Sequence, residues 1–109
     1  MDERTFQQHA EQAMERLKRS LYAVEEAAGF EVEERGGALH LNFDEPPGTF
    51  VISPNSAARQ LWISALSTSF KLDWDDAFDD FVLRSSGEPL PMLMARLLTE
   101  QTGDAVTLR

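Results

Sequence analysis

Hydrophobic residues near the N-terminus follow two different spacings, one helical and one strand-like. Apolar residues recur every three or four positions over residues 4–28, which predicts a long amphipathic helix that ends at Gly29. Phe30 and Val32 then alternate with glutamates, as in a strand that buries only one face. The Gly36-Gly37 pair that follows permits a tight turn. These features predict a helix followed by a β-hairpin.

The middle of the chain consists of short segments rich in alternating apolar or β-branched residues. They predict further strands at residues 38–43, 49–52, 60–66, 70–74 and 81–84. Ser53, Pro54 and Asn55 are predicted to end the second of them. Beyond the last strand the spacing becomes helical again, and a stripe of leucines predicts a second helix with Pro91 in its first turn and Gly103 at its end.

This order of elements predicts the fold class. One helix, about six antiparallel strands and a second helix are typical of an α+β two-layer sandwich, in which both helices pack on one face of a single sheet. A chain of 109 residues has room for one hydrophobic core. We therefore expect a single domain over residues 1–109, and a monomer in isolation.

Charge and cysteine content exclude several functions. With 10 Lys and Arg against 19 Asp and Glu, the net charge of −9 repels nucleic acid and anionic membranes and attracts cations and basic proteins. The chain has no cysteine, which excludes disulfides, cysteine nucleophiles and cysteine-ligated metal clusters. The acid-rich N-terminus is unlike a signal or transit peptide, and no apolar run approaches the ~20 residues of a membrane span. We expect a cytoplasmic protein of a bacterium, or a processed mitochondrial form, with no membrane partner.

One tryptophan is expected on the face of the sheet that the helices leave open. If the apolar residues at 61 and 63 face the helices, strand geometry places their neighbours on the opposite face. That face would carry Gln60, Trp62 and Ser64, with Lys71 and Asp73 from the next strand. An exposed aromatic residue among polar ones is typical of the centre of a protein contact. The alternative is a tryptophan that only packs against its neighbours.

Glutamates form a second candidate surface along the first helix and the first strand. They are Glu11, Glu15, Glu25, Glu26, Glu31, Glu33 and Glu34. If this strand lies at the sheet edge beside the helix, the carboxylates form one strip that could bind hard cations or meet a basic protein surface. Helical spacing supplies no converging cage, so weak and exchangeable binding is expected. The alternative is a solvated charged face without a ligand.

No arrangement typical of catalysis is present in the sequence. It contains no Ser-His-Asp arrangement, no glycine-rich phosphate loop and no paired histidine ligand motif. The aspartates within residues 73–80 lack the glycine and glutamate of an EF-hand loop, and we interpret them as an acidic turn. We therefore expect a binding protein and not an enzyme, with no tightly bound cofactor.

Several segments resemble one known family. The string QLWIS at residues 60–64 is followed by KLDW at residues 71–74, and then by a strand, a glycine and a leucine-rich helix. DERTFQQHAEQAMERL is similar to the family's first helix, and EERGGALHLNF is similar to its first hairpin. By these motifs the chain resembles the frataxins over nearly all of its length, with their order of one helix, six strands and a second helix.

The resemblance implies a regulator of iron-sulfur cluster assembly. Frataxins dock on a cysteine desulfurase and its iron-sulfur scaffold protein, and they bind iron weakly. Carried over by position, the partner-binding residues are Gln60, Trp62, Ser64, Lys71 and Asn55. The glutamates named above, apart from Glu34, correspond to the family's acidic ridge, which binds ferrous iron or ferric iron. Lys18 and Arg19 interrupt this ridge with positive charge, which weakens its expected attraction for iron.

Two other functions stay open on the sequence alone. An iron donor with ferroxidase activity would use the same glutamates, but oxidation needs a defined di-iron cage and the helix lacks paired ExxH spacing. An acidic α+β adaptor unrelated to iron requires the likeness at QLWIS and KLDW to be chance. Recovery of a cysteine desulfurase with the chain would separate this adaptor from the other functions.

Overall fold

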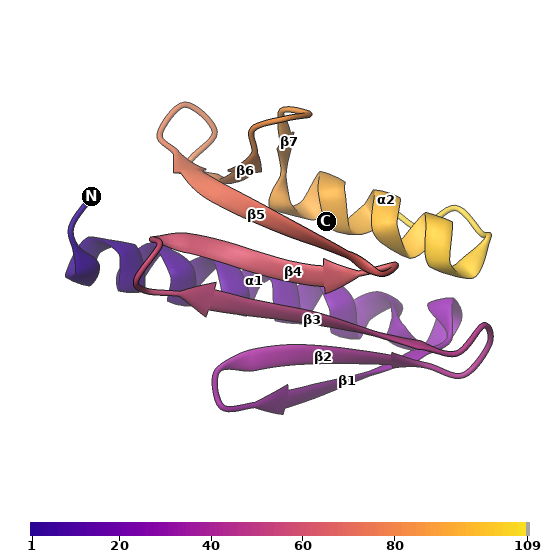
Figure 1. The fold of residues 1–109 in the computed structure, drawn as a ribbon. Helices are drawn as coiled ribbons and strands as arrows, with labels where there is room; N and C mark the ends of the chain where they lie inside the picture. The colour runs from indigo at the N-terminus through magenta and orange to yellow at the C-terminus, as the bar shows by residue number, and fades with distance from the viewer. Residues whose placement is uncertain (109) are drawn as a thin grey trace.

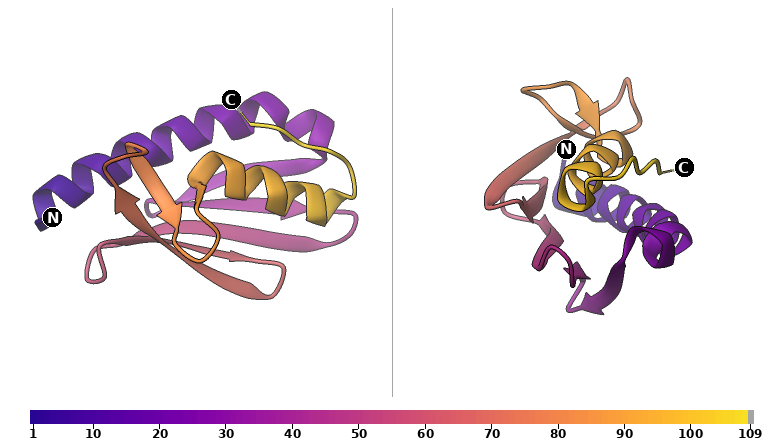
Figure 2. Two further views of the ribbon diagram at one scale, coloured as in Figure 1. Left: turned by 90° about the horizontal axis from the view of Figure 1, so that it is seen from above. Right: turned by 90° about the vertical axis from the view of Figure 1, so that its right-hand side faces the viewer.

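Two helices lie against one antiparallel sheet in the computed structural model, which describes residues 1–108 (Figure 1). In chain order the elements are α1 (Glu3–Ala28), β1 (Phe30–Arg35), β2 (Ala38–Phe43), β3 (Gly48–Asn55), β4 (Gln60–Ala65), β5 (Thr68–Asp75), β6 (Asp80–Leu83), β7 (Glu88–Pro89) and α2 (Leu90–Thr102). Sheet order follows chain order, so each strand pairs with its sequence neighbours. Both helices cover the same face of the sheet (Figure 2), which confirms the predicted two-layer α+β sandwich.

Local capping sets both ends of α1. Oδ1 of Asp2 accepts a hydrogen bond from the backbone N–H of Thr5 (2.8 Å), and this bond holds the pKa of the Asp2 carboxyl below its usual range. Gly29 adopts the left-handed conformation at the other end, with φ of 76°. The buried side of the helix consists of Phe6, Ala10, Ala13, Leu17 and Leu21, as the helical spacing predicts.

The sheet contains one strand that the sequence pattern does not indicate. β7 has only two residues, Glu88 and Pro89, which pair with Leu83 and Val82 of β6. Two residues are too few to show a period of two, so alternation could not predict this strand. The expected sheet of about six strands is otherwise confirmed.

β3 continues through the segment that was expected to end it. Residues 53–55 pair with residues 60–62 of β4. The pairing of β2 with β3 stops at Leu39 and Ile52, so Pro54 lies beyond the end of β2. One side of β3 is free there, and proline is tolerated in a strand that has a free side. The predicted boundary at Ser53 is therefore wrong.

The hydrophobic core lies between the sheet and the helices. Strands β2 to β5 send alternate residues into it, among them the fully buried Leu41, Ile52, Ile63 and Leu72. The buried residues of α2 are Leu90, Leu93, Met94, Leu97 and Leu98. Within residues 1–108, neither helix has the combination of length and apolar character that a membrane span requires.

An aromatic group packs beside the N-terminal half of α1. The ring of Phe81 makes edge contacts with Phe6 and Trp74, at centroid distances of 5.9 and 5.3 Å. His9 stacks on Trp74 at 3.6 Å, and the indole N–H of Trp74 donates to Oδ1 of Asp76 (2.8 Å). Trp74 is therefore partly buried on the helix side of β5, and His9 serves to cover it.

Candidate docking face and acidic groove

The open face of the sheet carries a connected group of side chains centred on Trp62. The indole N–H of Trp62 donates to Oε1 of Gln60 (2.9 Å), and the amide of Gln60 donates to Oδ1 of Asp73 (3.1 Å). Lys71 lies opposite Trp62 in the β4–β5 pair, with its ammonium 4.9 Å from the ring centroid. We call these four residues the Trp62 patch. Their contacts tie β4 to β5 on the face that the helices leave bare.

Trp62 is the exposed aromatic residue of this patch. It keeps 36% of its surface accessible, whereas Leu61 and Ile63 on either side keep 0% and 1%. The predicted orientation is therefore confirmed, because the indole faces away from the helices. The hydrogen bond to Gln60 and the Lys71 contact hold the ring in place, so a partner would lose little side-chain entropy by ordering it.

A hollow lies on the same face beside the indole. It has a volume of about 400 Å³, and its lining residues include Ser53, Trp62, Ser64, Ser69 and Lys71. Small serine side chains on three neighbouring strands leave this space open between Trp62 and the β4–β5 turn. The face can therefore receive a protruding side chain as well as pack against the indole.

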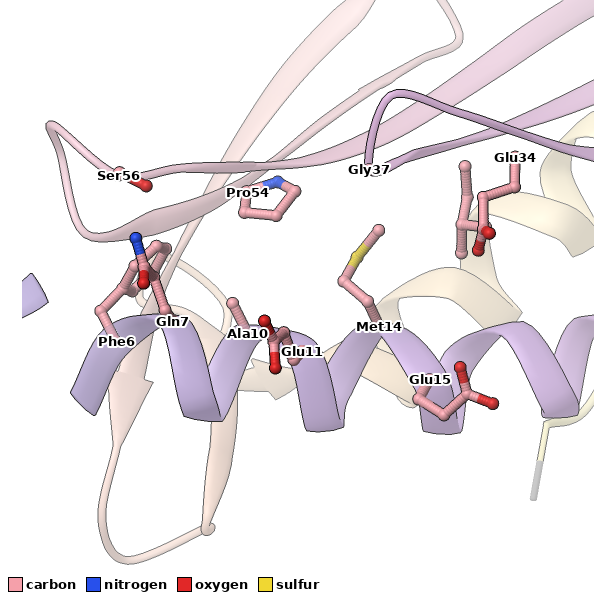
Figure 3. A pocket seen from close by; sticks show the side chains of 11 residues that line it. Phe6, Gln7, Ala10, Glu11, Met14, Glu15, Glu34, Gly37, Pro54 and Ser56 are labelled. Atoms are coloured by element: carbon pink, nitrogen blue, oxygen red, sulfur yellow. The ribbon is translucent and has the colours of Figure 1, made fainter. Parts of the chain in front are cut away.

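The predicted acidic strip is divided between two sides of the molecule. Glu11 and Glu15 lie on α1 along a groove of about 590 Å³, whose lining also includes apolar side chains (Figure 3). Glu31 and Glu33 occupy the positions of β1 that face away from the helices, opposite polar residues of β2. The structure therefore does not join the glutamates of α1 and β1 into one continuous strip.

Glu34 is the member of the predicted acidic strip on β1 that lines the groove. The ammonium of Lys18 lies 3.0 Å from Oε2 of Glu15 and 3.3 Å from Oε2 of Glu34, and its hydrogen bonds to Glu15 and Glu34 raise the pKa of Lys18. Figure 3 shows Glu34 on β1, across from the helix that carries Glu11 and Glu15. We call Glu11, Glu15 and Glu34 with the apolar floor between them the acidic groove. Alternation from Phe30 places Glu34 on the helix side, away from Glu31 and Glu33.

The last two glutamates of α1, Glu25 and Glu26, lie outside this groove. Oε2 of Glu25 accepts a hydrogen bond from the backbone N–H of Val32 (3.0 Å), on the edge strand β1. The bond satisfies an edge amide that has no strand partner on that side. Glu26 next to it is exposed. Across residues 1–108, no three acidic, histidine or cysteine side chains are grouped to hold a metal ion.

Comparison with known proteins identifies the family. The profile of the frataxin-like domain matches residues 1–104. This chain belongs to the frataxin family. The iron-sulfur cluster assembly protein CyaY of Dechloromonas aromatica (strain RCB) is 31% identical over 110 aligned residues, which cover 100% of both chains. CyaY of Stutzerimonas stutzeri (strain A1501) is 36% identical over 76 residues, 70% of this chain and 68% of that protein.

A solved frataxin structure supports the fold. The frataxin of Psychromonas ingrahamii superimposes with a TM-score of 0.81 over 98% of this chain and 97% of that one, at 20% sequence identity. The profile and the CyaY relatives confirm the family resemblance carried by QLWIS and KLDW. Those two motifs contribute all four residues of the Trp62 patch.

The other two predicted contact residues of this frataxin differ in position. Ser64 is exposed and lines the hollow beside Trp62. Asn55 lies at the end of β3, where its Oδ1 accepts a hydrogen bond from the backbone N–H of Ala58 (2.8 Å) and stabilises the β3–β4 turn. Asp73 was expected on the open face but not as a contact residue, and its bond to Gln60 makes it part of the patch.

Proposed function

We propose that this frataxin takes part in iron-sulfur cluster assembly as a regulator that docks on a cysteine desulfurase and its scaffold protein. The observation that carries the proposal is Trp62, a large and ordered indole on a sheet face that neither helix covers. Relatives at 31% and 36% identity are named iron-sulfur cluster assembly proteins. An exposed indole with polar neighbours is the type of residue that dominates binding energy at protein contacts.

The Trp62 patch suits a contact with a folded protein surface. The indole supplies apolar area, while Gln60, Lys71 and Asp73 form a polar margin around it. Each of these polar groups already has a partner within the patch, so binding leaves none of them without a hydrogen bond or charge contact. The hollow beside the ring adds a complementary shape for one side chain of the partner.

The acidic groove suits a basic side chain of the same assembly. Its floor includes Phe6, Met14 and Pro54, and its carboxylates are Glu11, Glu15 and Glu34. Lysine and arginine side chains match this combination, because a long apolar stem ends in a positive charge. Lys18 neutralises part of the acidic charge at Glu15 and Glu34. Within residues 1–108, no ion pair joins Glu11 to a cationic side chain. The net charge of −9 would also speed encounter with a basic surface.

The same carboxylates support weak iron binding in this proposal. Ferrous iron is bound by oxygen ligands, and tight binding requires several of them to converge on one point. Within residues 1–108 no three carboxylates are grouped to hold a metal ion, and Glu15 and Glu34 already pair with Lys18, so we expect exchangeable surface binding. A ferroxidase would need two metal ions in a fixed cage, and separate carboxylates favour the docking function over it.

Titration of the purified full-length protein into a purified complex of cysteine desulfurase and scaffold tests this function. We expect saturable binding with a Kd in the range of about 1–100 μM. The affinity should fall as salt is added, because salt screens the attraction between the acidic surface and a basic partner. Absence of saturable binding at low and at moderate salt would overturn the proposed function.

A further inference from the structure

The turn between β4 and β5 uses two residues whose backbone conformation is rare for them. Leu66 and Ser67 both have positive φ angles, of 53° and 60°. Ala65 and Thr68 form the last pair of the hairpin, so only these two residues make the turn. Two positive φ angles define a type I′ turn, in which asparagine and glycine are preferred. In other residues this conformation brings Cβ close to a carbonyl oxygen and costs free energy.

Another two-residue hairpin turn of this chain uses glycines at the positions with positive φ. The β1–β2 turn is made by Gly36 and Gly37, with φ angles of 54° and 84°. Glycine has no Cβ and adopts these angles without strain. Two other turns also hold a non-glycine residue at positive φ, Arg59 at 56° and Asp79 at 52°, but both residues are polar. Within residues 1–108, Leu66 is the one apolar residue in this conformation. Backbone strain of this kind concentrates at functional sites, so it calls for a role that leucine performs and glycine cannot.

Leu66 is also exposed at the tip of the hairpin. It keeps 36% of its surface accessible, the same fraction as Trp62. The hydroxyl of Thr68 donates to the carbonyl oxygen of Leu66 (3.3 Å), which helps to hold the turn in place. Residues 64–69 have the sequence SALSTS and contain no charged side chain. The tip thus presents an apolar side chain in an uncharged setting.

The tip is continuous with the proposed docking face. Trp62 and Lys71 lie on the two strands of the hairpin that Leu66 closes. Leu66 follows Trp62 by four residues, which corresponds to roughly 13 Å along a strand. The hollow lined by Ser64 and Ser69 occupies the interval between them. A partner that covers the indole and fills this hollow therefore reaches the tip.

We infer that Leu66 is a second contact point of the docking face, and that it inserts into an apolar hollow on the protein that covers Trp62. This inference rests on the proposed docking function. The matching surface of the partner is an apolar recess that receives the Leu66 side chain and carries no charged group at that point. Its contribution to affinity is therefore insensitive to salt, unlike that of the acidic groove.

A turn exchange separates the leucine from the turn geometry. Replacing Leu66→Asn together with Ser67→Gly creates the turn that type I′ geometry prefers and removes the apolar side chain. The double variant should unfold at a higher urea concentration than the wild type and bind the desulfurase–scaffold complex about tenfold more weakly, by the same factor at low and high salt. The single variant Ser67→Gly keeps Leu66, and should gain stability while it retains full affinity.

The outcomes distinguish this inference from the proposed function. Wild-type affinity in the folded double variant, with weakened binding by Trp62→Ala, overturns the role of Leu66 and leaves docking through Trp62 in place. A double variant no more stable than the wild type overturns the argument from strain. Absence of binding by the wild type overturns the docking function and this inference together.

Discussion

Replacing Trp62 with alanine is expected to weaken binding to the desulfurase–scaffold complex about 100-fold while the domain stays folded. Truncation of an aromatic residue at the centre of a protein contact costs about 2–4 kcal/mol, and 100-fold corresponds to about 2.7 kcal/mol. The fold should survive because Leu61 and Ile63 make the core contacts of β4, on the other face of the sheet. Calorimetric titration measures the affinity, and circular dichroism with urea unfolding confirms the folded state.

Two further variants sharpen this test. Trp62→Phe keeps an aromatic face but loses the N–H that donates to Gln60, so its affinity should lie between those of the wild type and the alanine variant. Asn42→Ala changes a polar residue of β2 that is exposed on the same face, outside the Trp62 patch, and should bind as the wild type does. Wild-type affinity in folded Trp62→Ala would remove the indole from the docking surface.

Replacing Glu11 and Glu15 with glutamine is expected to abolish weak ferrous iron binding. These two carboxylates line the groove that also contains Glu34, so they supply two of the three carboxylates of the acidic groove. Replacing Glu31 and Glu33 with glutamine should leave most of the binding intact, because both side chains point to the opposite face. Anaerobic calorimetric titration with ferrous iron compares the variants at one salt concentration.

The two double variants form a matched pair. Each removes two negative charges, so the long-range attraction for a cation falls by a similar amount in both. A difference between them therefore reports local coordination. Equal losses would show that iron responds only to net charge, and a loss confined to the Glu31 and Glu33 variant would contradict the assignment to the groove. Absence of ferrous binding by the wild type would remove the iron role.

Hydrophobic spacing was sufficient to predict the orientation of Trp62. Leu61 and Ile63 have only one face of the sheet on which to be buried, so the period of two turns the indole to the other face. The same reasoning placed Lys71 and Asp73 beside it. The contacts that link them depend on strand register, which the pairing of β4 with β5 sets and local spacing does not show.

The acidic surface was harder to predict, because its members come from two elements. Spacing along α1 placed Glu11 and Glu15 one turn apart, but a run of glutamates on β1 is divided by the alternation of strand side chains. Glu34 faces the helix, whereas Glu31 and Glu33 face away. Alternation along the strand shows which residues share a face of the sheet. Only the packing of α1 against the sheet shows which of them lie close to the helix.

The conformation of the β4–β5 turn also could not be predicted from the sequence pattern. Leu66 was assigned to a strand because its neighbours alternate, yet the strand ends at Ala65 and Leu66 begins the turn. Neither leucine nor serine indicates a type I′ turn, for which asparagine and glycine are the usual residues. The unusual conformation of Leu66 can therefore be recognised only from the backbone φ angles of the structure.

The two tryptophans of this frataxin provide the most direct test of the claim that the open face around Trp62 docks on the assembly complex. Trp62 lies on that face, whereas Trp74 stacks on His9 and donates to Asp76 on the helix side. Their indole N–H signals can be followed separately by NMR in an isotopically labelled, metal-free sample, with Trp62→Ala to assign them. On addition of the desulfurase–scaffold complex, we expect the Trp62 signal to shift or broaden before the Trp74 signal does. Selective change of the Trp74 signal, with the Trp62 signal unaffected in a complex that forms, would contradict it.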